Sequence, residues 1–108
     1  MTFLEEWVRV CDDKSLGNGE MAGFDHGEKK IMVARAAGKV YATDRICTHA
    51  FADLANGIMN EEECTVTCPL HLSAFKLEDG VPQSPPAENP LRTYKVKIQD
   101  AGIYIDIG

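Results

Sequence analysis

The sequence lacks an excess of basic residues, a long apolar run and any convincing helical repeat of apolar positions. The chain of 108 residues has 17 acidic and 11 basic residues, for a net charge of −6. This balance disfavours nucleic acid and anionic membrane surfaces and suits a partner with a basic docking patch. No apolar run approaches the roughly 20 residues that cross a bilayer, so we expect no membrane association.

The first residues also lack the apolar core of a secretion signal. Residues 1–6 read MTFLEE, whereas a signal peptide has a basic start and a longer apolar stretch. We therefore expect a cytoplasmic protein. The length gives room for one domain, residues 1–108, and we expect a monomer. Because so short a chain buries a modest core, a bound metal group would contribute to its stability.

Short apolar strands separated by glycine turns make up most of the chain. Tight turns are expected at His26-Gly27 and Gly38-Lys39. This spacing is typical of an all-β fold, a small antiparallel β-sandwich or barrel. The last two strands are expected to form a hairpin that closes the main sheet. The predicted strands cover residues 7–11, 20–25, 31–36, 40–43, 64–67, 92–99 and 103–107.

Four residues that bind metals well form two pairs in the middle of the chain. Cys47 and His49 stand in the motif Cys-Thr-His, and Cys68 and His71 stand in Cys-Pro-Leu-His. Eighteen residues separate His49 from Cys68. Each pair offers one soft thiolate and one imidazole, and each is expected on a loop.

This donor set is compatible with two kinds of metal centre. Two thiolates and two imidazoles could hold one tetrahedral zinc ion. They could also hold a [2Fe–2S] cluster in which cysteine binds one iron and histidine the other. Zinc sites usually open with a pair of closely spaced cysteines, and Cys64 with Cys68 would leave Cys47 and both histidines unexplained. Two mixed pairs in the same order favour the asymmetric cluster.

The two motifs closely resemble those of the Rieske [2Fe–2S] family. Gly57, Phe75, the proline-rich segment 81–91 and the segment 92–94 also stand where Rieske-type ferredoxins have similar residues. The likeness covers most of the chain, from about residue 7 to 107. It implies a Rieske-like β-sandwich with a cluster-binding subdomain of two ligand loops at about residues 44–76. It also implies a proline loop over the cluster at about 81–91, and the ligands Cys47, His49, Cys68 and His71.

Two departures from the family pattern are informative. Respiratory Rieske subunits have an extra cysteine in each ligand loop and join the two in a disulfide, but this chain has Leu70 in the second loop and no cysteine beyond Cys47 in the first. The chain thus resembles the ferredoxin branch, which suits a reducing compartment. Leu72 replaces the glycine of most relatives, and because leucine disfavours a positive φ, we expect a different backbone there.

The surroundings of the cluster are expected to set its reduction potential. In high-potential relatives a serine donates a hydrogen bond to a cluster sulfur, and a tyrosine two residues later donates to a ligand cysteine. This chain has Ser73 and Phe75 at these positions, so one donor at most remains, or none if Ser73 faces solvent. The resemblance therefore implies the lower half of the range of roughly −150 to +300 mV.

The resemblance implies a one-electron carrier rather than an enzyme, and the chain shows no candidate catalytic acid, base or nucleophile. Its partners would be a flavoprotein ferredoxin reductase and the terminal oxygenase of an aromatic-ring-hydroxylating dioxygenase. Two alternatives are a small subunit of a larger reductase, such as nitrite reductase, and a zinc-stabilised interaction module.

Three further residues lie outside the expected ligand set. Cys11 and Cys64 are expected to be reduced thiols, and Phe51 is expected to pack on the cluster or to face a docking partner.

Overall fold

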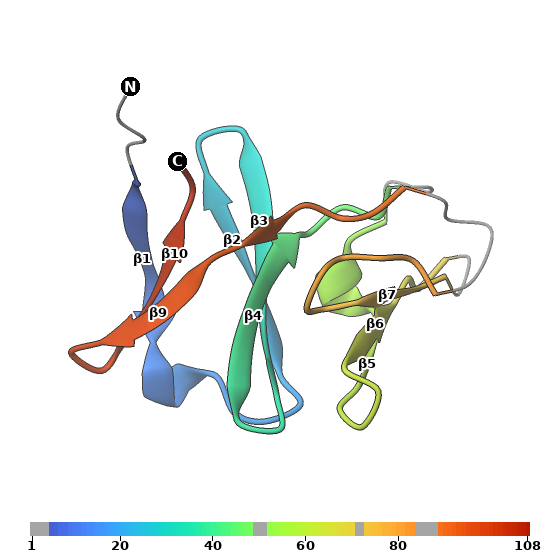
Figure 1. The fold of residues 1–108 in the computed structure, drawn as a ribbon, viewed down its shortest axis with the longest axis horizontal. Helices are drawn as coiled ribbons and strands as arrows, with labels where there is room; N and C mark the ends of the chain where they lie inside the picture. The colour runs from blue at the N-terminus through green and yellow to red at the C-terminus, as the bar shows by residue number, and fades with distance from the viewer. Residues whose placement is uncertain (1–4, 49–51, 71–72, 84–88) are drawn as a thin grey trace.

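The computed structural model describes residues 5–48, 52–70, 73–83 and 89–108, and within them the protein is a set of three antiparallel sheets. The main sheet has the order β2-β3-β4-β8, the second has β1-β10-β9 and the third has β5-β6-β7. Figure 1 shows the main sheet in the middle, with the second sheet to its left and the third to its right. Only two short 3-10 helices, η1 and η2, occur among the described residues. The all-β prediction is confirmed.

The bounds of the elements follow the predicted strands closely in the first half of the chain. The strands are β1 (Trp7–Asp12), β2 (Met21–His26), β3 (Lys29–Ala36), β4 (Lys39–Asp44), β5 (Ile58–Asn60), β6 (Thr65–Thr67), β7 (Ala74–Lys76), β8 (Thr93–Tyr94), β9 (Val96–Gln99) and β10 (Gly102–Asp106). The helices are η1 (Asp13–Ser15) and η2 (Leu54–Asn56).

Strand β3 lies between two cores, which explains its nearly continuous apolar sequence. Successive side chains of a strand point to opposite faces of the sheet. Ile31 and Val33 are buried in a core shared with the second sheet. Met32 and Ala34 are buried in another core, shared with the ligand segment between β4 and β8. A strand covered on both faces is apolar throughout, and here it joins the site to the scaffold.

The turn after β3 differs by one residue from the prediction. The strands are closed by the pair Ala36 and Lys39, so Ala37 and Gly38 form the two-residue loop. Both adopt positive φ, of 50° and 86°, as the twist of a two-residue hairpin requires. The β2–β3 turn shifts by one residue in the opposite direction, because His26 pairs with Lys29 and still belongs to the strand.

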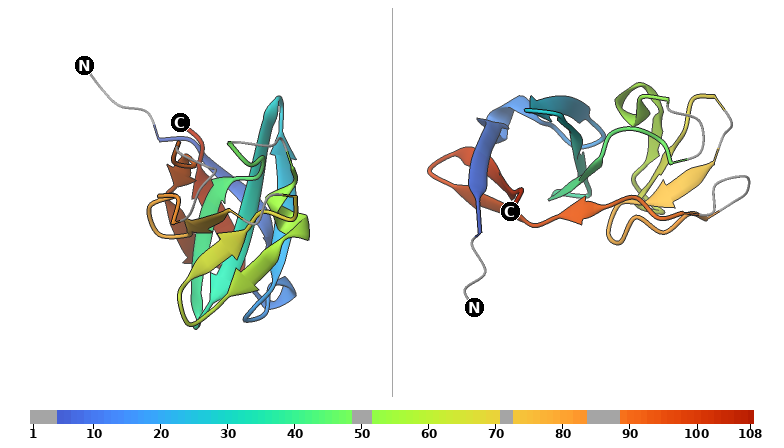
Figure 2. Two further views of the ribbon diagram at one scale, coloured as in Figure 1. Left: turned by 90° about the vertical axis from the view of Figure 1, so that its right-hand side faces the viewer. Right: turned by 90° about the horizontal axis from the view of Figure 1, so that it is seen from above.

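The predicted single strand over residues 92–99 is wrong, because the chain changes sheets at Lys95. Tyr94 pairs with Ala42 of β4 in the main sheet, whereas Val96 pairs with Ile105 of β10 in the second sheet. The carbonyl oxygen of Lys95 accepts a hydrogen bond of 3.0 Å from the backbone N–H of Asp106. The C-terminal hairpin therefore does not close the main sheet; it pairs with β1 in a sheet of its own (Figure 2).

Candidate metal-cluster site

The site lies in the segment between β4 and β8, which leaves the main sheet and returns to it beside its point of departure. The backbone N–H of Asp44, the last residue of β4, donates a hydrogen bond of 2.8 Å to the carbonyl oxygen of Arg92. Between these two residues the chain forms η2 and the third sheet, to the right of the scaffold in Figure 1. The two candidate cysteine ligands are thus carried on one side of the scaffold.

The first ligand loop starts at Cys47 and is closed by backbone pairing. The N–H of Cys47 donates to the carbonyl oxygen of Ala52 at 2.9 Å, and the N–H of Leu54 donates to that of Arg45 at 2.8 Å. Between these bonds, Ile46 forms a bridge with Asp53. The Asp53 carboxylate then caps η2 by accepting a hydrogen bond of 2.9 Å from the N–H of Ala55, as N-cap residues do. Both ends of the loop are therefore held in place.

The second ligand loop is closed in the same way. The N–H of Cys68 donates to the carbonyl oxygen of Ser73 at 2.8 Å, which repeats the offset of five residues found at the first loop. The flanking strands β6 and β7 pair through Val66 and Phe75, and this pairing fixes the base of the loop. Strand β7 begins directly after Ser73, so the second loop ends where its closing hydrogen bond is made.

The structure brings the two predicted cysteine ligands into one core. Cys47 is 2% exposed and Cys68 is fully buried, and both belong to the cluster that contains Leu54, Phe75 and Leu91. Neither cysteine is in a disulfide. The predicted histidine ligands His49 and His71 lie outside the described residues, as do Phe51 and Leu72.

The two cysteines fit a metal centre of soft character. Each thiol stands at the start of a loop closed by a backbone hydrogen bond, and each is shielded from water by apolar side chains. Thiolates bind zinc and iron–sulfur clusters in preference to hard cations. The loops thus offer two buried sulfur donors at matching positions, which is the arrangement that a shared cluster requires.

Two residues beside the second ligand loop are fully buried, Ser73 and Phe75. Burial of Ser73 rules out the alternative in which its hydroxyl faces solvent. Phe75 fills the core between the loops and presents no hydroxyl group there. A buried hydroxyl is usually hydrogen-bonded. Ser73 stands two residues after His71, so its buried hydroxyl is placed to act on a group bound by the second ligand loop.

The proline-rich segment is fixed at its two described ends, to β7 at one end and to the first ligand loop at the other. Pro82 forms a bridge with Phe75, and the N–H of Gln83 donates to the carbonyl oxygen of Ala74 at 2.7 Å. At the other end, the Thr48 hydroxyl donates to the carbonyl oxygen of Asn89 at 2.9 Å. These contacts connect the segment to the loop of Cys47 and to the strand that follows the loop of Cys68.

The two remaining cysteines lie outside the ligand loops, and both are free thiols as expected. Cys64 is partly buried and packs against the core that contains Cys47 and Cys68. Burial is the main cause that raises the pKa of Cys11. Cys64 adopts a left-handed backbone with φ of 57°, and its side chain hydrogen-bonds the Tyr41 hydroxyl, which raises the pKa of Tyr41 to about 12. Neither thiol belongs to the ligand loops.

Sequence reasoning missed two features that organise the site and gave no physical reason for a third. It gave no role to Arg45, whose guanidinium joins the first loop to β2, or to the hydrogen bond between Thr48 and Asn89. It noted Gly57 only by resemblance. A β-carbon there would overlap the carbonyl oxygen of Thr67, so the glycine lets η2 approach the strand that leads to Cys68.

Together, the fold and the paired loops define a small antiparallel β domain with one metal-cluster site. Comparison with known families agrees: the Rieske [2Fe-2S] domain matches residues 6–95. The chain belongs to the Rieske [2Fe–2S] domain family, whose members bind a [2Fe–2S] cluster. This supports the cluster over a zinc ion. Among the described residues, no helix has the length and apolar character needed to cross a bilayer.

Ferredoxin components of dioxygenases are prominent among the similar proteins. The ferredoxin component of biphenyl 2,3-dioxygenase from Rhodococcus jostii is 32% identical over 100 residues, which cover 93% of this chain and 92% of that protein. The ferredoxin of carbazole 1,9a-dioxygenase from Nocardioides aromaticivorans is 33% identical with a TM-score of 0.88, covering 92% of this chain and 95% of that chain. A ferredoxin solved in complex with the oxygenase of carbazole 1,9a-dioxygenase has a TM-score of 0.87 at 29% identity, covering 93% and 92%.

Proposed function

We propose that Cys47 and Cys68 bind one iron of a [2Fe–2S] cluster and that His49 and His71 bind the other. The observation that carries this proposal is the burial of two cysteines in one core, each at the start of a loop closed by the same backbone hydrogen bond. The spacing of the histidines, two and three residues after their cysteines, supports their assignment to the same two loops. The proposed cluster-binding subdomain covers residues 44–76.

A cluster held in this way takes up and releases one electron. Two thiolates and two neutral imidazoles leave its oxidised form formally uncharged, and such centres have potentials of roughly −150 to +300 mV. The chain supplies the apolar wall of Leu54, Phe75 and Leu91, which excludes water from the sulfur side. Because Phe75 lacks a hydroxyl and Leu70 allows no disulfide between the loops, we expect a potential in the lower half of that range.

We infer that the protein is the electron carrier of an aromatic-ring-hydroxylating dioxygenase system in the cytoplasm. It would receive electrons from a flavoprotein reductase and deliver them to a terminal oxygenase. The relatives that are ferredoxin components of such systems support this inference. Leu70, in the loop of Cys68 and His71, is 65% exposed, and an exposed apolar side chain beside the ligands suits a docking surface.

The test is an EPR spectrum of the dithionite-reduced protein, together with metal analysis of the same sample. We expect a rhombic signal, two irons per chain and nitrogen couplings from two imidazoles. Cys47→Ser and Cys68→Ser should each abolish the signal. Cys11→Ser and Cys64→Ser are matched controls that should retain it, because these thiols lie outside the ligand loops.

Other outcomes of these measurements would support a different function for this chain. A colourless sample with stoichiometric zinc and no EPR signal would indicate a zinc-stabilised interaction module. A cluster-containing protein that co-purifies with a large reductase subunit would indicate a fixed subunit rather than a diffusing carrier. Rapid reduction by a ferredoxin reductase and reoxidation by a ring-hydroxylating oxygenase would support the carrier.

A further inference from the structure

Arg45 lies at the base of the first ligand loop, and its guanidinium joins that loop to β2. The side chain is 14% exposed. Its Nη2 donates a hydrogen bond of 2.7 Å to the Asp25 carboxylate on β2. Its Nε lies 3.6 Å from the carboxylate of Asp53, the residue that caps η2 inside the ligand segment. A positive charge is thus held between the scaffold and the loop that begins at Cys47.

The backbone of Arg45 is fixed at the same place. Its N–H donates to the carbonyl oxygen of Lys30 at 3.0 Å, and its carbonyl oxygen accepts from the N–H of Leu54 at 2.8 Å. Arg45 therefore contacts the scaffold through its N–H and the ligand loop through its carbonyl, two residues before Cys47. A change in the position of its side chain would be transmitted to the start of the loop.

Gly23 of β2 provides the space in which the guanidinium lies. A β-carbon at this position would overlap Nη1 of Arg45 and would lie 3.1 Å from its Cδ and 3.2 Å from its Cζ. The backbone of Gly23 does not have a positive φ, so the conformation itself would accept another residue. The absence of a side chain at Gly23 is therefore explained by the arginine that lies against it.

The polar groups of Arg45 are incompletely satisfied. Nε is buried and has no hydrogen-bond partner among the described residues, since 3.6 Å from Asp53 is beyond hydrogen-bonding distance. Leaving a charged group short of partners in a buried position is unfavourable for stability. A purely structural arginine would be expected to use all its donors.

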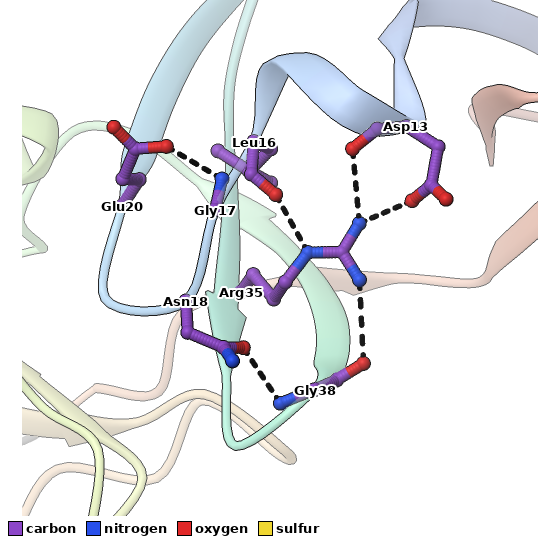
Figure 3. A network of polar contacts seen from close by, with 7 residues as sticks. All are labelled: Asp13, Leu16, Gly17, Asn18, Glu20, Arg35 and Gly38. Carbon is purple, nitrogen blue, oxygen red and sulfur yellow. Dashed lines mark hydrogen bonds and ion pairs between the residues drawn. The ribbon is translucent and has the colours of Figure 1, made fainter.

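Arg35 shows what such a structural arginine looks like in this protein. It is 15% exposed, nearly the same as Arg45. Its Nε donates to the carbonyl oxygen of Leu16 at 2.7 Å, and Nη1 and Nη2 donate to Gly38 and Asp13. Figure 3 shows that all three nitrogens have partners, on η1, on the residue that follows it and on the β3–β4 turn.

We propose that Arg45 is a positioning residue of the cluster site, which sets both the placement of the first ligand loop and the reduction potential. The proposal rests on the proposed function. Its charge, shielded from solvent, favours the more negative reduced cluster, because net charge near an iron–sulfur centre tunes its potential. Its links to Asp25 and Asp53 hold the loop of Cys47 against β2, in the way that residues behind metal ligands orient them.

The decisive comparison is Arg45→Met against Arg35→Met. Both variants remove one positive charge from side chains of nearly the same exposure, so the general effect of net charge is matched. We expect Arg45→Met to lower the reduction potential measured by spectroelectrochemical titration and to release the cluster about ten- to a hundredfold faster to a chelator. Arg35→Met should lower the melting temperature and leave the potential at the wild-type value.

Two further variants separate position from charge and keep the test informative if Arg45→Met fails to fold. Arg45→Lys keeps the charge but loses the planar fork, so cluster release should accelerate while the potential stays close to wild type. Gly23→Ala displaces the guanidinium without changing any charge and should also accelerate release. Gly27→Ala, in the adjacent turn with open space around it, is its control and should not.

The outcomes distinguish this inference from the proposed function. If the wild-type protein holds no [2Fe–2S] cluster by EPR, both are overturned. If the wild-type protein holds the cluster but Arg45→Met and Arg35→Met have equal potentials, or Gly23→Ala releases the cluster no faster than Gly27→Ala, only the role of Arg45 is overturned.

Discussion

Replacing Gly57 with alanine should disrupt the second ligand loop through a backbone clash. Gly57 ends η2 with φ of −85°, which alanine adopts without strain. The new β-carbon would lie 3.2 Å from the carbonyl carbon of Thr67 and would overlap its oxygen, and it would lie 3.1 Å from the carbonyl oxygen of Leu54. All three are backbone atoms, so no change of rotamer relieves the contact. A carbon and a carbonyl oxygen normally meet at about 3.3 Å or more, so η2 and β6 must separate.

The magnitude follows from the kind of contact. Overpacking in a core costs about 1–3 kcal/mol, and a clash between backbone segments belongs at the upper end. A loss of about 3 kcal/mol is a large part of the roughly 5–15 kcal/mol that stabilises a domain and should lower the melting temperature by about 10 °C or more. Because Thr67 directly precedes Cys68, the variant should also release the cluster faster.

Gly38→Ala is the matched control. Gly38 has φ of 86° with open space around its α-carbon, so alanine there meets only the left-handed backbone penalty of about 1–2 kcal/mol. We expect a smaller drop in melting temperature and wild-type retention of the cluster. The assays are thermal unfolding by circular dichroism and loss of visible absorbance in the presence of a chelator. Equal effects of the two variants on cluster release would refute the reasoning.

Three further predictions concern single polar contacts. Burial, followed by the hydrogen bond of 2.5 Å to Asp44, raises the pKa of Tyr94 to about 12. The contribution of the neutral Tyr94 to stability is complete below its ordinary pKa of about 10 and should be lost between pH about 10 and about 12. Urea titrations across this range should show that loss in the wild-type protein and not in Tyr94→Phe. Ser73→Ala should lower the potential by about 40 mV, the equivalent of one hydrogen bond of roughly 1 kcal/mol, and an unchanged potential would show that Ser73 does not act on the cluster. Thr48→Val removes the bond to Asn89 and should accelerate cluster release about fivefold, as expected for about 1 kcal/mol; release at the wild-type rate would contradict this.

The strands of the scaffold could be predicted because their local pattern and their environment agree. The apolar run of β3 corresponds to a strand that is buried on both faces. The alternating isoleucines of β10 correspond to a strand with one face in the core. The two cysteines were predicted as ligands from their spacing with the histidines, because metal ligands need particular residue types close together. The structure places both in one core, and their role as ligands stays a prediction.

Features that depend on pairing between distant segments could not be predicted. Tyr94, Val96 and Ile98 alternate as one strand would, yet Tyr94 is buried in the main sheet while Ile98 is 48% exposed at the edge of another. Nothing in the local pattern marks the change of partner at Lys95. Arg45 carries no signal either, because a single arginine in a polar loop has no periodicity and its role depends on Gly23, more than twenty residues earlier.

The hydrogen bond between Asp44 and Arg92 has a consequence for how the ligand-bearing segment is joined to the scaffold. The ligand-bearing segment leaves and re-enters the scaffold at adjacent positions, so a short turn could join β4 directly to β8 and leave an ordinary hairpin. In this respect the segment behaves as an insertion, which needs only two neighbouring strand ends to accept it. The same geometry makes the segment a candidate for grafting into another protein. Any antiparallel strand pair with an exposed turn offers two neighbouring strand ends to which the segment could be joined.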